Sequence, residues 1–385
     1  MKFFRCGFLT VLSGIFSIPF GILMLVQVLR LPVVSVVALL AEPKVVRLGF
    51  FMVILTVITL LLALCKKTPV RFVNLGFAAL GLICALIVMI TNLSIASKNG
   101  AEISLGLALS GAKDSAAADV EIDAYTVFDG EEVGLSIWLP RNVDSGAPVA
   151  MFIHGGGWMN ESRFTSGDMH HCRFFAENGY LVVSVDYPLA SEGNPMYDCQ
   201  EDTIALAIAW LQENAAEYGG DMSRFYVMGN SAGGNLALNL AARINQGEFT
   251  ELLGEDFCVN AASVMFPATD ISAMYEKVPA PLGFLVRSMC TTNWGGTPEE
   301  YPERYAANST NLLVDESMAP VFTVYGKNDH MTSSDVVESF IQTLTDLNVD
   351  NDSISFPFAD HLCDVAGSIE AQTWRDGTLK WFAVY

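Results

Sequence analysis

Charged side chains are scarce in this sequence: they make up 16% of the 385 residues, against roughly 25% in an ordinary soluble domain. Basic residues are the rarer sign, with 21 Lys and Arg against 42 Asp and Glu. Residues 1–97 hold eight basic side chains and one acid, so nearly all the acids lie beyond them. The chain therefore divides into an apolar, weakly basic head and an acidic body. Because an acidic surface repels phosphates, this balance excludes nucleic acid as a partner.

The head contains three stretches without any charge, which predict membrane-spanning helices near residues 6–29, 48–65 and 72–97. A fourth apolar stretch, Leu31 to Ala41, is short and flanked by prolines, so we interpret it as a re-entrant or interfacial piece. The three spans lack Asp, Glu and His, so nothing in them indicates a proton relay or an ion site, which favours an anchor over a transport role. The sequence thus predicts that residues 1–97 anchor the chain in a lipid bilayer.

The short loops of the head predict its orientation. With the N-terminus inside, five basic residues (Lys2, Arg5, Lys66, Lys67 and Arg71) lie on the cytoplasmic side and four lie outside. The first apolar stretch is too long for a cleaved signal peptide. We expect a multi-pass protein of the cell membrane whose body lies on the extracellular side.

Cysteine usage excludes two kinds of structural site. The chain has eight cysteines, five of them in the body, and no C-x-x-C pair. An odd number without metal-ligand spacing predicts free thiols rather than a disulfide framework or a zinc site. We expect no metal and no cofactor.

The body shows short apolar runs that alternate with helical periods after a linker at residues 98–119. We expect strands at Tyr125–Phe128, Val133–Leu139, Pro148–Ile153, Tyr180–Val185, Phe225–Met228, Ala262–Phe266, Val321–Tyr325 and Ser353–Phe356. We expect helices at Ser166–Asn178, Met196–Tyr218, Ala232–Asn245, Ser333–Leu347 and Ile369–Trp381. This alternation predicts that residues 120–385 form an α/β domain, a mostly parallel eight-stranded sheet with helices on both faces. Residues 270–312, longer than an ordinary crossover, are interpreted as a cap or as ordinary helix packing.

The strand Phe225–Met228 runs into Gly229-Asn230-Ser231-Ala232-Gly233 and then into a helix. This is G-x-S-x-G between a strand and a helix, where a tight turn exposes the serine hydroxyl at the helix N-terminus. The turn predicts Ser231 as a nucleophile.

Upstream, the strand Pro148–Ile153 ends in His154-Gly155-Gly156-Gly157-Trp158. Consecutive glycines after a strand let backbone amides approach a developing oxyanion.

A serine nucleophile needs a base, and five histidines allow elimination. His154 belongs to the glycine turn, His170 and His171 precede the nucleophile on a helix, and His330 adjoins the expected acid. His361, in the loop after the last strand, remains. The acid is expected after the preceding strand, in the chain order Ser, Asp, His, which favours Asp329. Asp335 and Asp360 are the rivals, although one opens a helix and the other adjoins the histidine.

Together these motifs, with Val185-Asp186-Tyr187, resemble the α/β-hydrolase esterases of the hormone-sensitive-lipase-like and acetyl esterase group. They are also similar to the feruloyl or acetyl-xylan esterases and to kynurenine formamidase. The resemblance, over roughly residues 120–385, implies Ser231 as nucleophile, His361 as general base and acid, and Asp329 as orienting acid. It also implies an oxyanion hole formed by the amides of Gly156, Gly157 and Ala232. Asn230 and Pro188 depart from the common pattern, which leaves the subfamily open.

The expected function is therefore hydrolysis of a small carboxylic ester, short-chain or acetyl, through an acyl-enzyme and without a cofactor. Two alternatives stay open. An amide-directed hydrolase, a formamidase or peptidase, would use the same groups, and a hydrolase-like module would bind a partner without turnover. The sequence indicates no particular protein partner.

Overall fold

The structure is a computed structural model that describes residues 2–30, 39, 41–111, 116–143, 146–278 and 281–385. The chain forms two compact units. The first consists of Met1–Lys113 and Phe356–Thr373, and the second of Asp114–Ser355 and Trp374–Tyr385.

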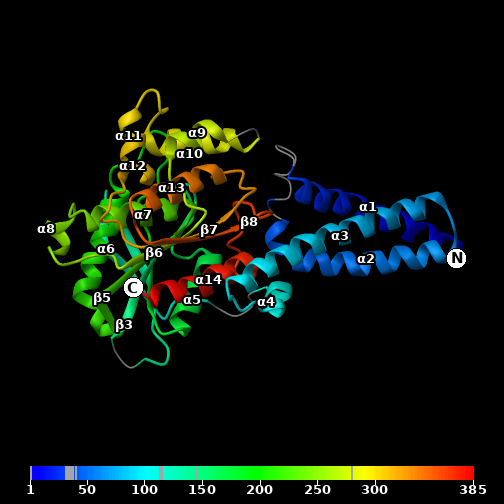
Figure 1. The fold of residues 1–385 in the computed structure, drawn as a ribbon, viewed down its shortest axis with the longest axis horizontal. Coiled ribbons are helices and arrows are strands. Elements are labelled where there is room, and N and C mark those ends of the chain that lie inside the picture. The colour runs from blue at the N-terminus through cyan, green and yellow to red at the C-terminus, as the bar shows by residue number, and fades with distance from the viewer. Residues whose placement is uncertain (1, 31–38, 40, 112–115, 144–145, 279–280) are drawn as a thin grey trace. The chain divides into compact units, whose positions relative to one another are not determined.

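The first unit is built on long apolar helices. Its elements are α1 (Lys2–Leu29), η2 (Glu42–Lys44), α2 (Val45–Cys65), α3 (Pro69–Lys98) and the short α4 (Leu105–Ser110). The helices α1, α2 and α3 run side by side (Figure 1) and are long and apolar enough to cross a membrane. The helix α4 lies inside the segment expected to be a linker. Most of the piece interpreted as re-entrant or interfacial, Leu31 to Ala41, lies outside the described residues.

The second unit contains one sheet of eight strands, in the order β1-β2-β4-β3-β5-β6-β7-β8. The strands are β1 (Val120–Phe128), β2 (Glu131–Trp138), β3 (Ala147–Ile153), β4 (Leu181–Val185), β5 (Gly220–Asn230), β6 (Ala261–Met265), β7 (Val321–Gly326) and β8 (Asn351–Phe356). β1 and β2 pair antiparallel, as do β2 and β4, whereas β4, β3, β5, β6 and β7 pair parallel in turn. The eight expected strands and the mostly parallel sheet are confirmed.

Helices connect these strands: α5 (Ser166–Glu177), α6 (Gln200–Asn214), η3 (Ala215–Tyr218), α7 (Ser231–Asn245), α8 (Thr250–Leu253), α9 (Ile271–Lys277), α10 (Leu282–Trp294), α11 (Pro302–Ala307), α12 (Thr310–Leu313), α13 (Ser334–Asp346) and α14 (Ile369–Phe382). Adjacent residues of β3 point to opposite faces, as in any strand. Met151 belongs to the main core with residues of α6 and α7, whereas the Phe152 ring lies 6.3 Å from that of Trp374 in α14. Helices therefore cover both faces, as the sequence predicts.

Candidate active site

Ser231 stands at the junction of β5 and α7. It is the first residue of α7, with Asn230 as the N-cap, and its backbone has a φ of +51°. A positive φ is uncommon for a residue with a side chain and marks stored strain. This conformation is the sharp strand-to-helix turn that the G-x-S-x-G motif predicts.

The two glycines of the motif are required by backbone contacts. A Cβ on Gly229 would lie 2.5 Å from the carbonyl oxygen of Gly233, and a Cβ on Gly233 would lie 2.1 Å from the carbonyl oxygen of Ile153. Both contacts are shorter than any real Cβ contact, and neither partner is a movable side chain. The turn therefore packs directly against the end of β3, which carries the glycine-rich turn.

That glycine-rich turn lies beside the serine turn because Ile153 of β3 pairs in register with Gly229 of β5. Three successive residues have positive φ: Gly156 at +96°, Gly157 at +62° and Trp158 at +61°. A Cβ on Gly156 would meet the carbonyl oxygen of Asn160 at 2.0 Å. The backbone thus takes a tight path that glycine permits and that brings amide groups to the edge of the sheet holding Ser231.

Tyr187, which follows β4, holds the start of this turn. Its hydroxyl donates to the carbonyl oxygens of His154 at 2.9 Å and Gly155 at 3.1 Å. The rings of His154 and Tyr187 stack with centroids 4.3 Å apart and 14° between planes. Burial lowers the pKa of His154 to about 4, so the ring is neutral near pH 7. The stacked ring supports a structural role for His154 at the start of the glycine-rich turn.

Next to Ser231 in the chain, Asn230 donates from Nδ2 to Oδ1 of Asp168 in α5 at 3.1 Å, and both side chains are buried. The sequence places His170 and His171 on the same helix but does not predict the contact between Asn230 and Asp168. His171, one of those histidines, packs edge-on against Trp374 with centroids 5.1 Å apart. Asn230 and Asp168 are 62 residues apart, so no local pattern could have joined them.

Asp329 lies in the turn after β7, as expected. Its Oδ1 accepts the backbone amides of Met331 and Thr332, each at 2.7 Å, and its Oδ2 accepts the Thr332 hydroxyl at 2.8 Å. The rival Asp335 pairs with Lys277 at 2.6 Å and is more than half exposed. The other rival, Asp360, accepts the backbone amide of His361 at 2.8 Å. Of the three, Asp329 lies in a turn directly after a parallel strand, where ligands of such sheets bind.

His361 follows β8. It belongs to the segment Phe356–Thr373 of the first compact unit, whereas Ser231 and Asp329 belong to the second. The expected site residues are therefore distributed over both units of the chain.

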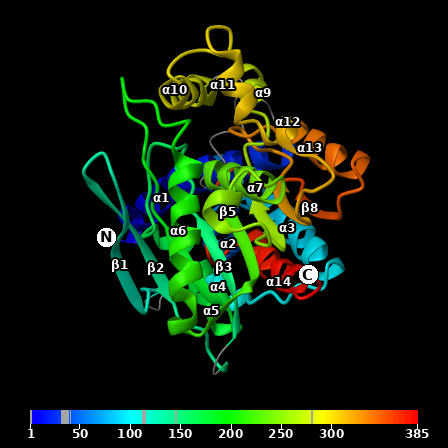
Figure 2. The same ribbon diagram turned by 90° about the vertical axis from the view of Figure 1, so that its left-hand side faces the viewer.

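Residues 270–312 were expected to form a cap or ordinary helix packing. They form a set of short helices, α9 to α12, gathered at one end of the sheet (Figure 2). A cavity of about 690 Å³ is lined by three hydroxyl-bearing residues of α10 (Ser288, Thr291 and Thr292), by Arg304, and by Met159, next to the glycine-rich turn. A Cβ on Gly157 would touch Met289 of α10 at 2.7 Å, so α10 packs against that turn.

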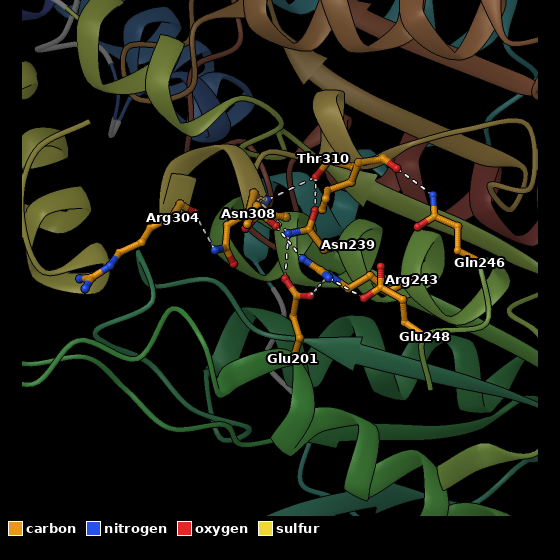
Figure 3. A network of polar contacts seen from close by, with 11 residues as sticks. Glu201, Asn239, Arg243, Gln246, Glu248, Arg304, Asn308 and Thr310 are labelled. Atoms are coloured by element: carbon orange, nitrogen blue, oxygen red, sulfur yellow. Dashed lines mark hydrogen bonds and ion pairs between the residues drawn. The ribbon is translucent and has the colours of Figure 1, made fainter. Parts of the chain in front are cut away.

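A buried polar network attaches these short helices to α6 and α7 (Figure 3). Arg243 of α7 pairs through Nε with Glu201 of α6 at 2.7 Å and donates to the carbonyl oxygen of Ala307 at 2.6 Å. Asn239 donates to Glu201 at 2.8 Å and to the carbonyl oxygen of Asn308 at 3.1 Å. Burial raises the pKa of Glu201 to about 7, although Arg243 and Asn239 act in the opposite direction.

Within the described part of the chain, no group of three His, Cys, Asp or Glu residues could hold a metal ion. Seven cysteines are free thiols: Cys65, Cys84, Cys172, Cys199, Cys258, Cys290 and Cys363.

Comparison with known proteins gives one family: residues 135–344 match BD-FAE. The carboxylesterase NlhH of Mycobacterium tuberculosis is 38% identical over 125 residues, which are 32% of this chain and 38% of that protein. Esterase LipQ of the same organism is 27% identical over 263 residues, 66% of this chain and 60% of that protein. The chain thus spans between about a third and two thirds of the length of these curated relatives.

Solved structures share the fold. Esterase 2 of Thermogutta terrifontis, phosphonylated by sarin, has a TM-score of 0.57 and 20% identity, covering 69% of this chain and 95% of that one. An inhibited esterase B of Lactobacillus rhamnosis has a TM-score of 0.58 and 19% identity, covering 77% and 95%. These similarities show an α/β-hydrolase fold.

Proposed function

The chain belongs to the BD-FAE family, and from this premise we propose that it is a serine carboxylic-ester hydrolase tethered to a membrane by residues 1–97. The observation that carries the proposal is the strained turn of Ser231 (φ +51°), packed against a glycine-rich turn at the same sheet edge. The curated relatives, named carboxylesterase and esterase, support the same reaction.

In the proposed mechanism, Ser231 attacks the ester carbonyl carbon while His361 accepts the hydroxyl proton. The carbonyl oxygen becomes an oxyanion that accepts hydrogen bonds from the amides of Gly156, Gly157 and Ala232. His361 then donates its proton to the departing alcohol. Water, deprotonated by His361, attacks the acyl carbon, and His361 returns the proton to the Ser231 oxygen as the acid leaves. Asp329 orients the imidazole and stabilises its charged form.

The sheet order supports these roles, because Asp329 follows β7 and His361 follows the neighbouring strand β8. In parallel sheets the loops after the strands meet at one edge. Asp329 is the proposed orienting acid because it lies in the turn directly after β7, whereas Asp335 is an exposed residue of α13 and Asp360 adjoins His361 itself.

The proposed substrate is a short-chain or acetyl ester of a small alcohol. The resemblance of the motifs around Ser231 to the acetyl esterase group supports it. We propose residues 270–312 as a cap over this site and residues 120–385 as the catalytic domain. Amide hydrolysis is the alternative, and matched ester and anilide substrates with the same acyl group separate the two.

The decisive experiment compares Ser231→Ala with Ser223→Ala in the full-length protein, using p-nitrophenyl acetate. Ser223 lies at the opposite, exposed end of β5 and serves as the control. We expect turnover to vanish in Ser231→Ala and to persist in Ser223→Ala. Wild-type turnover by Ser231→Ala would refute the proposal. A protein that never turns over any ester, although Ser231 is intact, would favour a binding module.

Membrane tethering and an external catalytic domain are proposed from the three apolar helices and from the five-to-four bias of basic loop residues. Protease added to intact cells should cut the catalytic domain. A domain that is cut only after the cells are opened would place it inside.

A further inference from the structure

The segment Phe356–Thr373, which carries His361, forms one compact unit with the N-terminal helices. The segment is a long loop followed by the first residues of α14. Its contacts with α1 to α4 therefore bear on how His361 is held.

The start of the segment is fixed by α1 and by the core of the helix bundle. Nη1 of Arg30, just beyond α1, donates to the carbonyl oxygen of Pro357 at 3.3 Å. The Phe358 ring packs on a buried apolar cluster of the bundle, formed by Met24, Val45, Cys84, Ala85 and Val88. Phe358 lies three residues before His361, so the bundle holds the chain directly ahead of the imidazole.

The end of the segment is fixed by α3 and by the chain that follows it. Asn92 of α3 donates from Nδ2 to Oε1 of Glu370, 278 residues away, and both side chains are fully buried. The backbone amide of Ser104 donates to Oε1 of Gln372 at 2.7 Å. A buried carboxylate is costly unless it accepts hydrogen bonds, so the Asn92 contact fixes this end of the segment strongly.

Between the two ends, the segment is tied to itself. The Ser368 hydroxyl donates to the carbonyl oxygen of Cys363 at 2.6 Å and accepts the amide of Ala371 at 2.9 Å. Nε2 of Gln372 donates to the carbonyl oxygen of Gly367 at 3.0 Å. A displacement of Glu370 or Phe358 would therefore be passed along the loop to His361.

We propose that the N-terminal helices position the general base, and that Asn92 and Phe358 are positioning residues for the reaction. The proposal rests on the proposed role of His361. A base must lie within hydrogen-bonding reach of its nucleophile, and a misplacement of about 1 Å costs on the order of a hundredfold in rate. The bundle then does more than tether the enzyme: its integrity sets the turnover number.

The test compares two identical substitutions on one helix, in the full-length protein reconstituted in lipid vesicles. Asn92→Leu removes the donor to Glu370. Asn74→Leu is the matched control, because Asn74 is also buried in α3 but donates to Thr10 and Ser13 of α1, within the bundle. Both lose buried hydrogen bonds, and only Asn92 touches the segment that carries His361.

We expect kcat for p-nitrophenyl acetate, per folded protein at the assay temperature, to fall at least about tenfold in Asn92→Leu, with KM within about twofold. In Asn74→Leu both constants should stay within about twofold of wild type. Equal kcat in the two variants overturns the proposal, because a purely structural loss would affect both alike.

Phe358→Ala keeps the inference testable if Asn92→Leu does not fold. It should also lower kcat without raising KM, and an unchanged kcat would count against the bundle as a positioning element. Failure of this inference is distinct from failure of the proposed function. If Ser231→Ala is inactive but Asn92→Leu and Phe358→Ala turn over substrate like the wild type, ester hydrolysis stands and only the role of the helices is refuted.

Discussion

Tyr187→Phe probes whether the glycine-rich turn is held in place for catalysis. The substitution removes one hydroxyl that donates to two carbonyl oxygens, those of His154 and Gly155, at 2.9 and 3.1 Å. Losing the donor to buried acceptors costs about 1–3 kcal/mol. Because the turn would relax while the ring stack remains, we expect the amides of Gly156 and Gly157 to lose alignment with the oxyanion. Loss of one such donor lowers kcat roughly 10²–10³-fold, so partial misalignment should cost about 10–100-fold.

The assay is steady-state hydrolysis of p-nitrophenyl acetate together with a thermal unfolding curve. Tyr226→Phe is the matched control, because Tyr226 is equally buried and lies on β5 five residues before Ser231, with its hydroxyl donating to the carbonyl oxygen of Phe382 at 3.1 Å. Both variants should lose similar stability, and only Tyr187→Phe should lose kcat. If kcat is unchanged in Tyr187→Phe, or falls equally in both, the reasoning about the turn is wrong.

Three further outcomes follow from the same structure. Gly233→Ala should abolish turnover and lower the melting temperature, since its Cβ would lie 2.1 Å from a backbone oxygen of β3, whereas Gly167→Ala, with open space around it, should leave kcat unchanged. Asn230→Ala should destabilise the fold by about 1–3 kcal/mol in denaturant titrations, because a buried carboxylate of α5 loses a donor; a neutral result would show that the contact is unimportant. Glu201 has a pKa of about 7 in the folded protein against an ordinary value of 4.5. Its contribution to the free energy of unfolding is therefore fully present below about pH 4.5 and is lost as the pH rises through 7. The stability of wild type relative to Glu201→Gln should fall by about 3 kcal/mol over that window, and a difference that grows with pH would contradict the assignment.

The sequence predicts the central strands well because β3, β4, β6 and β7 are short apolar runs in which nearly every residue is buried. The ends of the strands are harder to predict from the sequence. β5 begins at Gly220, five residues before the expected Phe225, because Gly220 and Asp221 pair with the start of β3. Propensity gives no sign of such pairing, since glycine and aspartate are poor strand formers. Long-range register decides the boundary.

In the candidate site, too, the sequence predicts the local features but not the contacts between distant residues. Ser231 and the glycine-rich turn carry their signal in adjacent residues, and the structure places both turns at one sheet edge. The contacts that support them join residues distant in sequence: Asn230 with Asp168, and Asn92 with Glu370. Asparagine and acidic residues are common everywhere, so a single sequence offers no pattern that pairs them.

The most direct test of the central claim is the site at which a fluorophosphonate reacts. Full-length protein is treated with the probe, digested, and the adduct is located by tandem mass spectrometry while residual esterase activity is followed. We expect one adduct, on Ser231, whose extent matches the loss of activity. Complete inactivation with the adduct on another residue, or ester turnover that survives full labelling of Ser231, would contradict it.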